Sequence, residues 1–235
     1  MAYSPTRYRI ISTFILISLL FVFPAQVIAL GELDIPPLDE FVETMMNGEA
    51  DVLRGVYVPG VLADLVTPQP ADNPAYVTPT KDTLTQFGLA SKYGSTGLLA
   101  HNYLAGKSFS HLEKGQLIFL IYGDGRTETF VVIEFMRVQA LTPESITSNF
   151  IDLDSGEFLS VSKLFLDAYN RPDHVILQTC LFANGNNSWG RLFIIAEPYD
   201  PALSIPTSRG ERDDEDIVNL WSGSLAVSST HFIYQ

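Results

Sequence analysis

Residues 175–196, VILQTCLFANGNNSWGRLFIIA, decide how the rest of the chain can be arranged. An apolar, strand-like run ends at Thr179 and Cys180, and a second apolar run begins at Arg191. The residues between them are rich in Asn, Gly and Ser, which predicts two antiparallel strands joined by a ten-residue loop with turn-forming residues at its tip. In such a hairpin Cys180 leaves one strand close to the point where Arg191 enters the other.

The chemistry of this hairpin follows from its thiol, because Cys180 is the only cysteine of the chain. A fixed positive charge stabilises a thiolate relative to a thiol, and the thiolate is the nucleophilic form. Arg191 is therefore expected to lower the pKa of the Cys180 thiol somewhat. The simpler interpretation is a buried cysteine that packs as a small apolar side chain.

Composition limits the classes of function. The chain has 235 residues, of which 46% are hydrophobic and 17% charged, so a packed core is expected. Its formal net charge is −13 at pH 7. Nucleic acids and anionic membrane surfaces both attract basic patches, so this acidity argues against either as a partner.

The first 29 residues have the pattern of an export signal. Arg7 and Arg9 precede an apolar run over residues 10–23, and small residues precede a cleavage site after Ala29. We interpret residues 1–29 as a signal peptide or an N-terminal membrane anchor. The expected location is the extracellular side of the cytoplasmic membrane, with the protein either secreted or attached to the membrane. An unpaired cysteine in an exported chain indicates a reactive thiol or an intermolecular bridge.

The rest of the pattern favours an all-β fold. Short apolar runs bounded by Gly, Pro, Asn or Asp recur at residues 56–58, 61–66, 96–100, 117–122, 127–133 and 135–141. Short helices are expected at residues 38–45, from a start at Thr142 with Pro143 in the first helical position, and at 160–169. Many short strands with few helices predict a barrel or a sandwich. The β domain is expected to cover residues 30–197, followed by a C-terminal extension over 198–235.

A histidine and the hairpin together carry a family resemblance. The strand at residues 96–100 delivers His101 at its end. The matching segments are GLLAHN at 97–102, LQTC at 177–180 and RLFIIAE at 191–197. Over roughly residues 53–197 this order of His, Thr-Cys and Arg resembles the sortases, and the His segment is nearest their class B form. Ala100 stands where most sortases have Gly before the His.

The resemblance implies a sortase-like closed β-barrel with a few short helices, and an exported cysteine transpeptidase. Cys180 would attack a backbone carbonyl of a peptide or protein that bears a sorting signal, forming a thioacyl-enzyme. His101 would act as general acid and then as general base. Arg191 would hold the substrate backbone or stabilise the oxyanion. Thr179 would shape the substrate pocket. The acceptor would be an amine on the cell envelope or on another protein.

Two alternatives remain open. A cysteine protease of the same fold would use water as the acceptor, and an extracellular binding module would use the barrel without catalysis. A binding module needs no lowered cysteine pKa, so thiol reactivity separates these classes. Neither the pattern nor the resemblance implies a cofactor. Asp152, Asp154 and Gly156 resemble the start of a calcium loop, but Lys163 occupies the position of the expected Glu, so a turn is predicted and no metal site.

Overall fold

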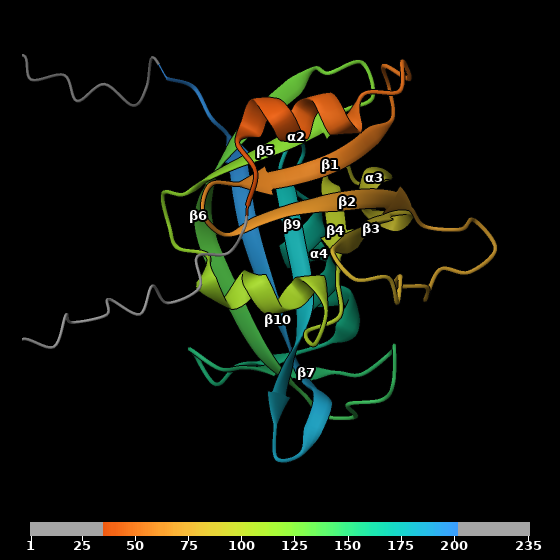
Figure 1. Ribbon diagram of the computed structural model, residues 1–235. Coiled ribbons are helices and arrows are strands. Elements are labelled where there is room, and N and C mark those ends of the chain that lie inside the picture. Colours follow the sequence, from red (N-terminus) through yellow and green to blue (C-terminus); the bar gives the residue numbers. More distant parts are fainter. Residues whose placement is uncertain (1–34, 202–235) are drawn as a thin grey trace, which may run out of the picture.

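The computed structural model describes residues 35–201 (Figure 1). Its helices are α2 (Leu38–Met45), α3 (Gly88–Ser91), the 3₁₀ helix η2 (Ala105–His111) and α4 (Val161–Tyr169). Its strands are β1 (Leu53–Val58), β2 (Leu62–Pro68), β3 (Thr83–Phe87), β4 (Thr96–Leu99), β5 (Leu117–Tyr122), β6 (Thr127–Ala140), β7 (Phe150–Asp152), β8 (Phe158–Leu159), β9 (Val175–Ala183) and β10 (Asn186–Pro198).

Eight of these strands form a closed barrel. The sheet runs in the order β10-β9-β4-β3-β2-β1-β5-β6, and an additional pairing between β10 and β6 closes the ring. The pairs are antiparallel except for β2 with β3 and β4 with β9, which are parallel. The predicted all-β barrel with a few short helices is therefore confirmed. Closing the ring leaves these eight strands without a free edge, because every strand is paired on both sides.

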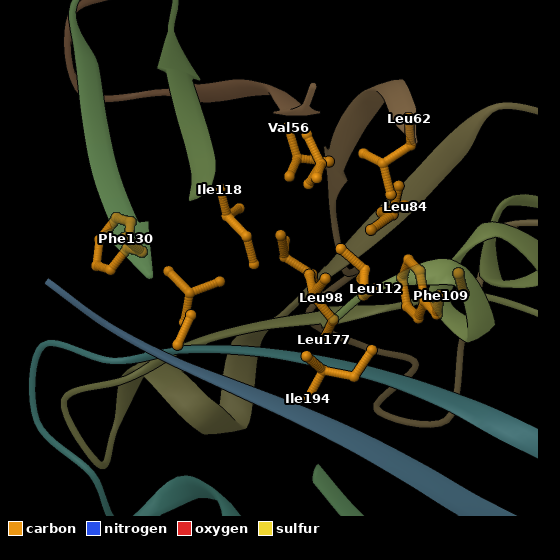
Figure 2. Close-up of a cluster of buried hydrophobic side chains, with 14 of the residues drawn as sticks. Val56, Leu62, Leu84, Leu98, Phe109, Leu112, Ile118, Phe130, Leu177 and Ile194 are labelled. Atoms are coloured by element: carbon orange, nitrogen blue, oxygen red, sulfur yellow. The ribbon is translucent and has the colours of Figure 1, made fainter. Parts of the chain in front are cut away.

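The barrel interior is filled by aliphatic and aromatic side chains from strands around the whole ring (Figure 2). Val56, Leu84, Leu98, Leu177 and Ile194 are fully or almost fully buried and come from five different strands. Each such side chain contributes roughly 1.5–3 kcal/mol by leaving water. This interior holds the strands in fixed register, so groups at their ends also have fixed relative positions.

A second apolar cluster covers the outer face of β9 and β10. Ile176, Phe193 and Ile195 pack there against Leu164 and Tyr169 of α4. Strand β9 is therefore buried on both faces, which explains why its sequence begins as a continuous apolar run rather than an alternating one. Helix α4 begins as predicted, because the Ser160 hydroxyl accepts a hydrogen bond from the Lys163 backbone N–H at 3.2 Å. Whereas α4 covers β9 and β10, helix α2 covers a different part of the barrel, strands β1 and β5.

The hairpin that opens the sequence is longer than predicted. Strand β9 continues past Cys180 to Ala183 and β10 already begins at Asn186, so the predicted ten-residue loop is wrong. The connection is a tight turn in which Asn184 and Gly185 both have positive φ, as two-residue hairpin turns require. A register shift between Asn186 and Gly190 accommodates the polar residues as a bulge. In Figure 1 the tip of this hairpin projects beyond β7.

Residues 142–149 form turns instead of the helix expected from Thr142 and Pro143, so that prediction is wrong. The Ser145 backbone N–H donates to the Thr142 carbonyl at 2.9 Å, and the Ser148 hydroxyl accepts from the Thr142 N–H at 2.9 Å. Ser and Thr side chains that bond the local backbone compete with helical hydrogen bonds.

Two predictions concern the ends of the chain. The expected signal peptide or anchor at residues 1–29 and the extension beyond residue 201 lie outside the described residues. Within residues 35–201, no helix is long and apolar enough to cross a membrane.

Candidate active site

Cys180 and Arg191 lie in two paired strands of the barrel, and His101 follows the end of a third strand, β4, that is the other neighbour of β9. Arg191 of β10 lies directly opposite Cys180 of β9 in the antiparallel pair. On the other side of β9, the parallel pairing with β4 ends at Leu99 opposite Gln178, and the Ala100 N–H donates to the Gln178 carbonyl at 3.1 Å. His101 follows the end of β4 by two residues. The structure thus pairs Arg191 with Cys180 directly, and the barrel order brings the end of β4 to the other side of the same strand β9.

Strand alternation assigns these groups to the outer face of the barrel. Cys180 shares its face with Gln178 and Ile176, while Leu177 and Thr179 alternate onto the interior side. Arg191 likewise shares the outer face with Phe193. The reactive groups therefore face the side that carries α4.

A cavity of about 560 Å³ opens on this outer face. It is lined by Pro74, Ala75, Val77, Phe87, Leu89, Tyr93, Leu99, Ser145, Ile146, Phe150, Val161, Ser162, Leu164, Phe165, Leu166, Tyr169, Gln178, Arg191 and Phe193. Most of these side chains are apolar. Two of the polar ones lie close to Cys180 in the sheet: Gln178 is two residues before it in β9, and Arg191 is its partner in β10. A concave apolar surface with few polar groups is the usual form of a site for an organic ligand. Arg191 lines this cavity, whereas Cys180 and His101 do not.

The guanidinium of Arg191 is held by backbone carbonyls. Its Nη1 donates to the carbonyls of Ser188 and Gly190 at 2.9 and 2.8 Å, and its Nη2 donates to the Pro143 carbonyl at 3.4 Å. The side chain is half-buried. These contacts fix the planar group between the hairpin and the 142–149 turns, so its charge has a defined position beside Cys180.

Cys180 is a free, half-buried thiol whose protonated form is favoured. Burial raises the pKa of the Cys180 thiol above its ordinary value, Arg191 opposes this by lowering it, and Glu144 raises it further. The expected contribution of Arg191 is therefore present with the predicted sign. The expected net lowering is wrong, because the loss of hydration on burial outweighs the attraction of one guanidinium.

The segment around His101 is anchored on both sides. The His101 carbonyl accepts from the N–H groups of Leu104 and Gly106 at 3.0 and 3.1 Å. The Asn102 side chain donates to the Asn187 carbonyl at 3.0 Å and so ties this segment to the hairpin. The imidazole itself stacks on the ring of Tyr103, with centroids 5.2 Å apart and an interplanar angle of 18°.

Thr179 lies inside the barrel rather than on the cavity face. Its side chain is buried, and its hydroxyl donates to the Ala100 carbonyl at 2.8 Å. Gly106 packs closely against it, since a Cβ at that position would come within 2.3 Å of the Thr179 Oγ1. The hydroxyl therefore joins β9 to the residue that precedes His101.

Glu144 is the site residue that the sequence interpretation missed. It lies in the 142–149 turns, and its Oε1 accepts a hydrogen bond from the Asn186 side chain at 3.1 Å. The sequence had assigned this residue to a helix start, and no local pattern connects it to a cysteine 36 positions away. Its place beside the thiol is a product of the tertiary fold.

The described residues give no sign of a metal centre. Within residues 35–201, no group of three or more His, Cys, Asp or Glu side chains is arranged to hold a metal ion. The segment that resembles a calcium loop is a turn, in which the Asp152 carboxylate accepts from the backbone N–H groups of Asp154 and Ser155 at 3.0 and 2.7 Å. The turn predicted for residues 152–156 is confirmed.

Comparisons with known proteins find similarity in structure. No family model matches the sequence, and no curated protein matches it. Among solved structures, the chain is similar to sortase C from Clostridium perfringens SM101, with 18% identity, 66% of this chain and 73% of that chain covered, and a TM-score of 0.39. It is also similar to sortase A from Listeria monocytogenes, with 15% identity, coverage of 63% and 88%, and a TM-score of 0.39. A third is Clostridium perfringens sortase C with the C-terminal cell wall sorting motif, with 18% identity, coverage of 65% and 72%, and a TM-score of 0.38.

Proposed function

We propose that this protein is a sortase-like cysteine transpeptidase that acts outside the cytoplasmic membrane. The observation that supports the proposal is the strand order: Arg191 of β10 pairs with Cys180 of β9, and His101 follows the end of β4, the other neighbour of β9. A nucleophile, a group able to move protons and a fixed cation side by side can perform acyl transfer. The export signal expected at residues 1–29 agrees with substrates on the cell envelope.

The first half of the reaction acylates the thiol. Cys180 Sγ attacks a backbone carbonyl of a peptide that bears a sorting signal and lies in the cavity. Arg191 faces the oxygen on which negative charge develops, and fixed charge acts strongly where water is excluded. The C–N bond then breaks, His101 gives its proton to the leaving amine, and a thioester remains on Cys180.

The second half releases the acyl group. An acceptor amine attacks the thioester, His101 takes its proton, and a new amide bond replaces the C–S bond. Because burial raises the pKa of Cys180, the reactive thiolate is a minor form of the thiol, and we expect slow turnover.

Thr179 contributes to this mechanism as a positioning residue. Its hydroxyl holds the Ala100 carbonyl, and Ala100 is covalently joined to His101. The pocket is shaped through this strand-to-strand bond, while the hydroxyl stays on the interior side.

The test is mass spectrometry of the full-length protein after incubation with candidate sorting peptides. The expected result is a thioacyl adduct on Cys180 that disappears when an amine is added. Cys180→Ala should give no adduct and no cleavage while keeping the fold, and activity near the wild-type level in that variant would refute the proposal. An adduct that yields only the free acid, whatever amine is added, would assign the protein to the hydrolases.

A second candidate is an extracellular binding module with the same fold. The raised pKa of Cys180 favours it, because a protein that only binds a peptide needs no thiolate. The two functions separate in one measurement: a binding module would hold the sorting peptide with equal affinity in the wild type and in Cys180→Ala, and neither would cleave it.

A further inference from the structure

A carboxylate lies within electrostatic reach of the proposed nucleophile. Glu144 is exposed, and the Asn186 side chain holds its Oε1 at 3.1 Å. Its chain neighbours fix the position: the Pro143 carbonyl accepts from Arg191, and Ser145 lines the cavity. Glu144 therefore stands at the border between the cavity and the hairpin.

The charge of Glu144 is not neutralised within the part of the chain that the structure describes. None of the ion pairs between residues 35 and 201 includes it. Arg191, whose guanidinium reaches the carbonyl of the neighbouring Pro143, donates its hydrogen bonds to the carbonyls of Ser188, Gly190 and Pro143, and the Asn186 amide that binds Glu144 is neutral. A free negative charge thus remains at the site.

This charge opposes the first half of the proposed reaction. A negative group near the thiol disfavours the thiolate, and Glu144 raises the pKa of Cys180 in addition to burial. Once Cys180 is acylated, the sulfur carries no charge in any form and this penalty disappears. A cation that arrives after acylation would meet the charge of Glu144 without this penalty.

We propose that Glu144 is the recognition site for the ammonium group of the acceptor amine. This assignment rests on the proposed transpeptidase function. An alkyl amine has a pKa of about 10, so the acceptor reaches the site as a cation. An unpaired carboxylate beside the thioester attracts that cation and disfavours anionic acceptors. The chemical class selected is a primary amine on a chain without a neighbouring negative charge.

The proton balance of the step is complete with groups already named. The ammonium gives one proton to neutral His101 and becomes a free amine. The nitrogen then attacks the thioester carbonyl, the C–N bond forms and the C–S bond breaks. The second proton lost by the nitrogen goes to Cys180 Sγ, which leaves as a thiol, and His101 releases its proton to solvent.

The test separates acceptor binding from thiol chemistry. Full-length protein is acetylated on Cys180 with S-phenyl thioacetate, and loss of the acetyl group is followed by intact mass spectrometry. The acceptors are cadaverine, which is cationic at pH 7.5, and methoxyamine, which is neutral. Glu144→Gln should raise the cadaverine concentration needed for half-maximal deacetylation about fivefold, in the range typical of an exposed charge pair. Methoxyamine should react equally with both proteins.

Two controls sharpen the result. Glu43→Gln removes the same charge from an exposed position on α2, across the barrel, and should match the wild type. High salt should weaken cadaverine binding to the wild type and leave the variant unchanged. Equal cadaverine dependence in the wild type and Glu144→Gln would overturn the assignment while leaving the transpeptidase function standing. If no amine speeds deacetylation of the wild type, the proposed function fails, and the assignment fails with it.

Discussion

The thiol of Cys180 and the carboxyl of Asp64 are both buried acids, but they lie in regions with different surroundings. Burial raises the pKa of Cys180, and it raises the pKa of Asp64 to about 6. Cys180 has a guanidinium directly across the strand pair, held in place by three carbonyls. The energetic cost of burying an ionisable group at the site is therefore partly offset by a cation placed for that purpose.

Asp64 has no such arrangement. It alternates with Leu62 and Val66 on the interior side of β2, and its Oδ2 is buried without a hydrogen-bond partner among residues 35–201. After burial, Asp82 raises its pKa further, and Lys81 lowers it. The carboxyl therefore carries a nearly uncompensated desolvation penalty.

This difference teaches how to distinguish a site from a defect in packing. Both groups have raised pKa values, so the shift alone separates nothing. Polar groups from three segments are tied together around Cys180: the β9–β10 hairpin, the 142–149 turns and the His101 segment. Around Asp64, the interior cluster is apolar. Convergence of fixed polar groups, rather than the direction of a pKa shift, is the feature that separates the proposed site from the surroundings of Asp64.

The largest expected effect comes from removing the planar cation of the site. Arg191→Lys keeps the charge but cannot donate to several carbonyls in one plane. We expect turnover of the peptide that acylates Cys180 to fall roughly 10²–10³-fold, as for the loss of an oxyanion donor. The control is Arg137→Lys, an exposed arginine paired with Asp154. If the Arg191→Lys variant keeps most of the activity, a positive charge at position 191 is sufficient and the planar guanidinium is not required.

The next effect tests whether the His101 segment is rigidly placed. Gly106→Ala would bring a Cβ within 2.3 Å of Thr179 Oγ1 and 2.8 Å of the His101 carbonyl, so the segment must shift. A displacement of about 1 Å in a catalytic group can cost on the order of 10²-fold in rate. Steady-state turnover measures this, with Gly88→Ala as control because the nearest atom there lies at 3.9 Å. Unchanged turnover in Gly106→Ala would show that the region tolerates movement.

Sequence alone predicted the strands that carry or precede the proposed site residues, although not where β9 ends and β10 begins, and the reasons are local. His101, Cys180 and Arg191 stand beside apolar runs whose length and composition indicate strands, and closing the barrel aligns them. Glu144 could not be found this way, because its contact with Asn186 spans 42 residues. The raised pKa of Cys180 was missed for the same reason: neighbours in sequence show the charge of Arg191 but not the depth of burial.

The predictions for the hairpin loop and for residues 142–149 were wrong for a different physical reason. Asn, Gly and Ser between residues 184 and 190 suit a loop, but a bulge lets several of them remain in a strand. Thr142 and Pro143 suit a helix start. The hydrogen bonds that the Ser145 N–H and the Ser148 hydroxyl make with the Thr142 backbone form turns instead. In both segments the local preference was ambiguous, and tertiary packing decided.

Asp64 gives an effect of intermediate size, on stability. Its pKa in the folded state, about 6, lies above the unfolded value of 3.8, so the fold binds the proton more tightly than the unfolded chain does. The stabilisation is full below about pH 4 and is lost as the pH rises through about 6. Asp64→Asn should therefore raise the free energy of unfolding at pH 8, by about 1–3 kcal/mol relative to its effect at pH 4. Urea unfolding of both proteins at the two pH values measures this. If the free energy of unfolding of the Asn variant depends on pH as that of the wild type does, the Asp64 carboxyl is hydrated. The comparison between Asp64 and Cys180 would then no longer hold.

The smallest effect concerns the balance of charges on the thiol itself. Iodoacetamide alkylates the thiolate, so the rate at Cys180 should rise with pH along a curve whose midpoint lies above neutrality, since burial raises the pKa of the thiol. Glu144 opposes the thiolate from an exposed position, and Glu144→Gln should speed alkylation at pH 7.5 by about two- to threefold, as expected for one screened charge. Glu43→Gln should leave the rate unchanged. The direction is informative because the same Glu144→Gln variant is expected to bind a cationic acceptor less well. A substitution that merely loosened the site would change both measurements through disorder, and high salt would then leave the difference in alkylation rate intact. If the difference instead disappears in high salt, the effect is electrostatic, and the thiol lies between two fixed charges of opposite sign.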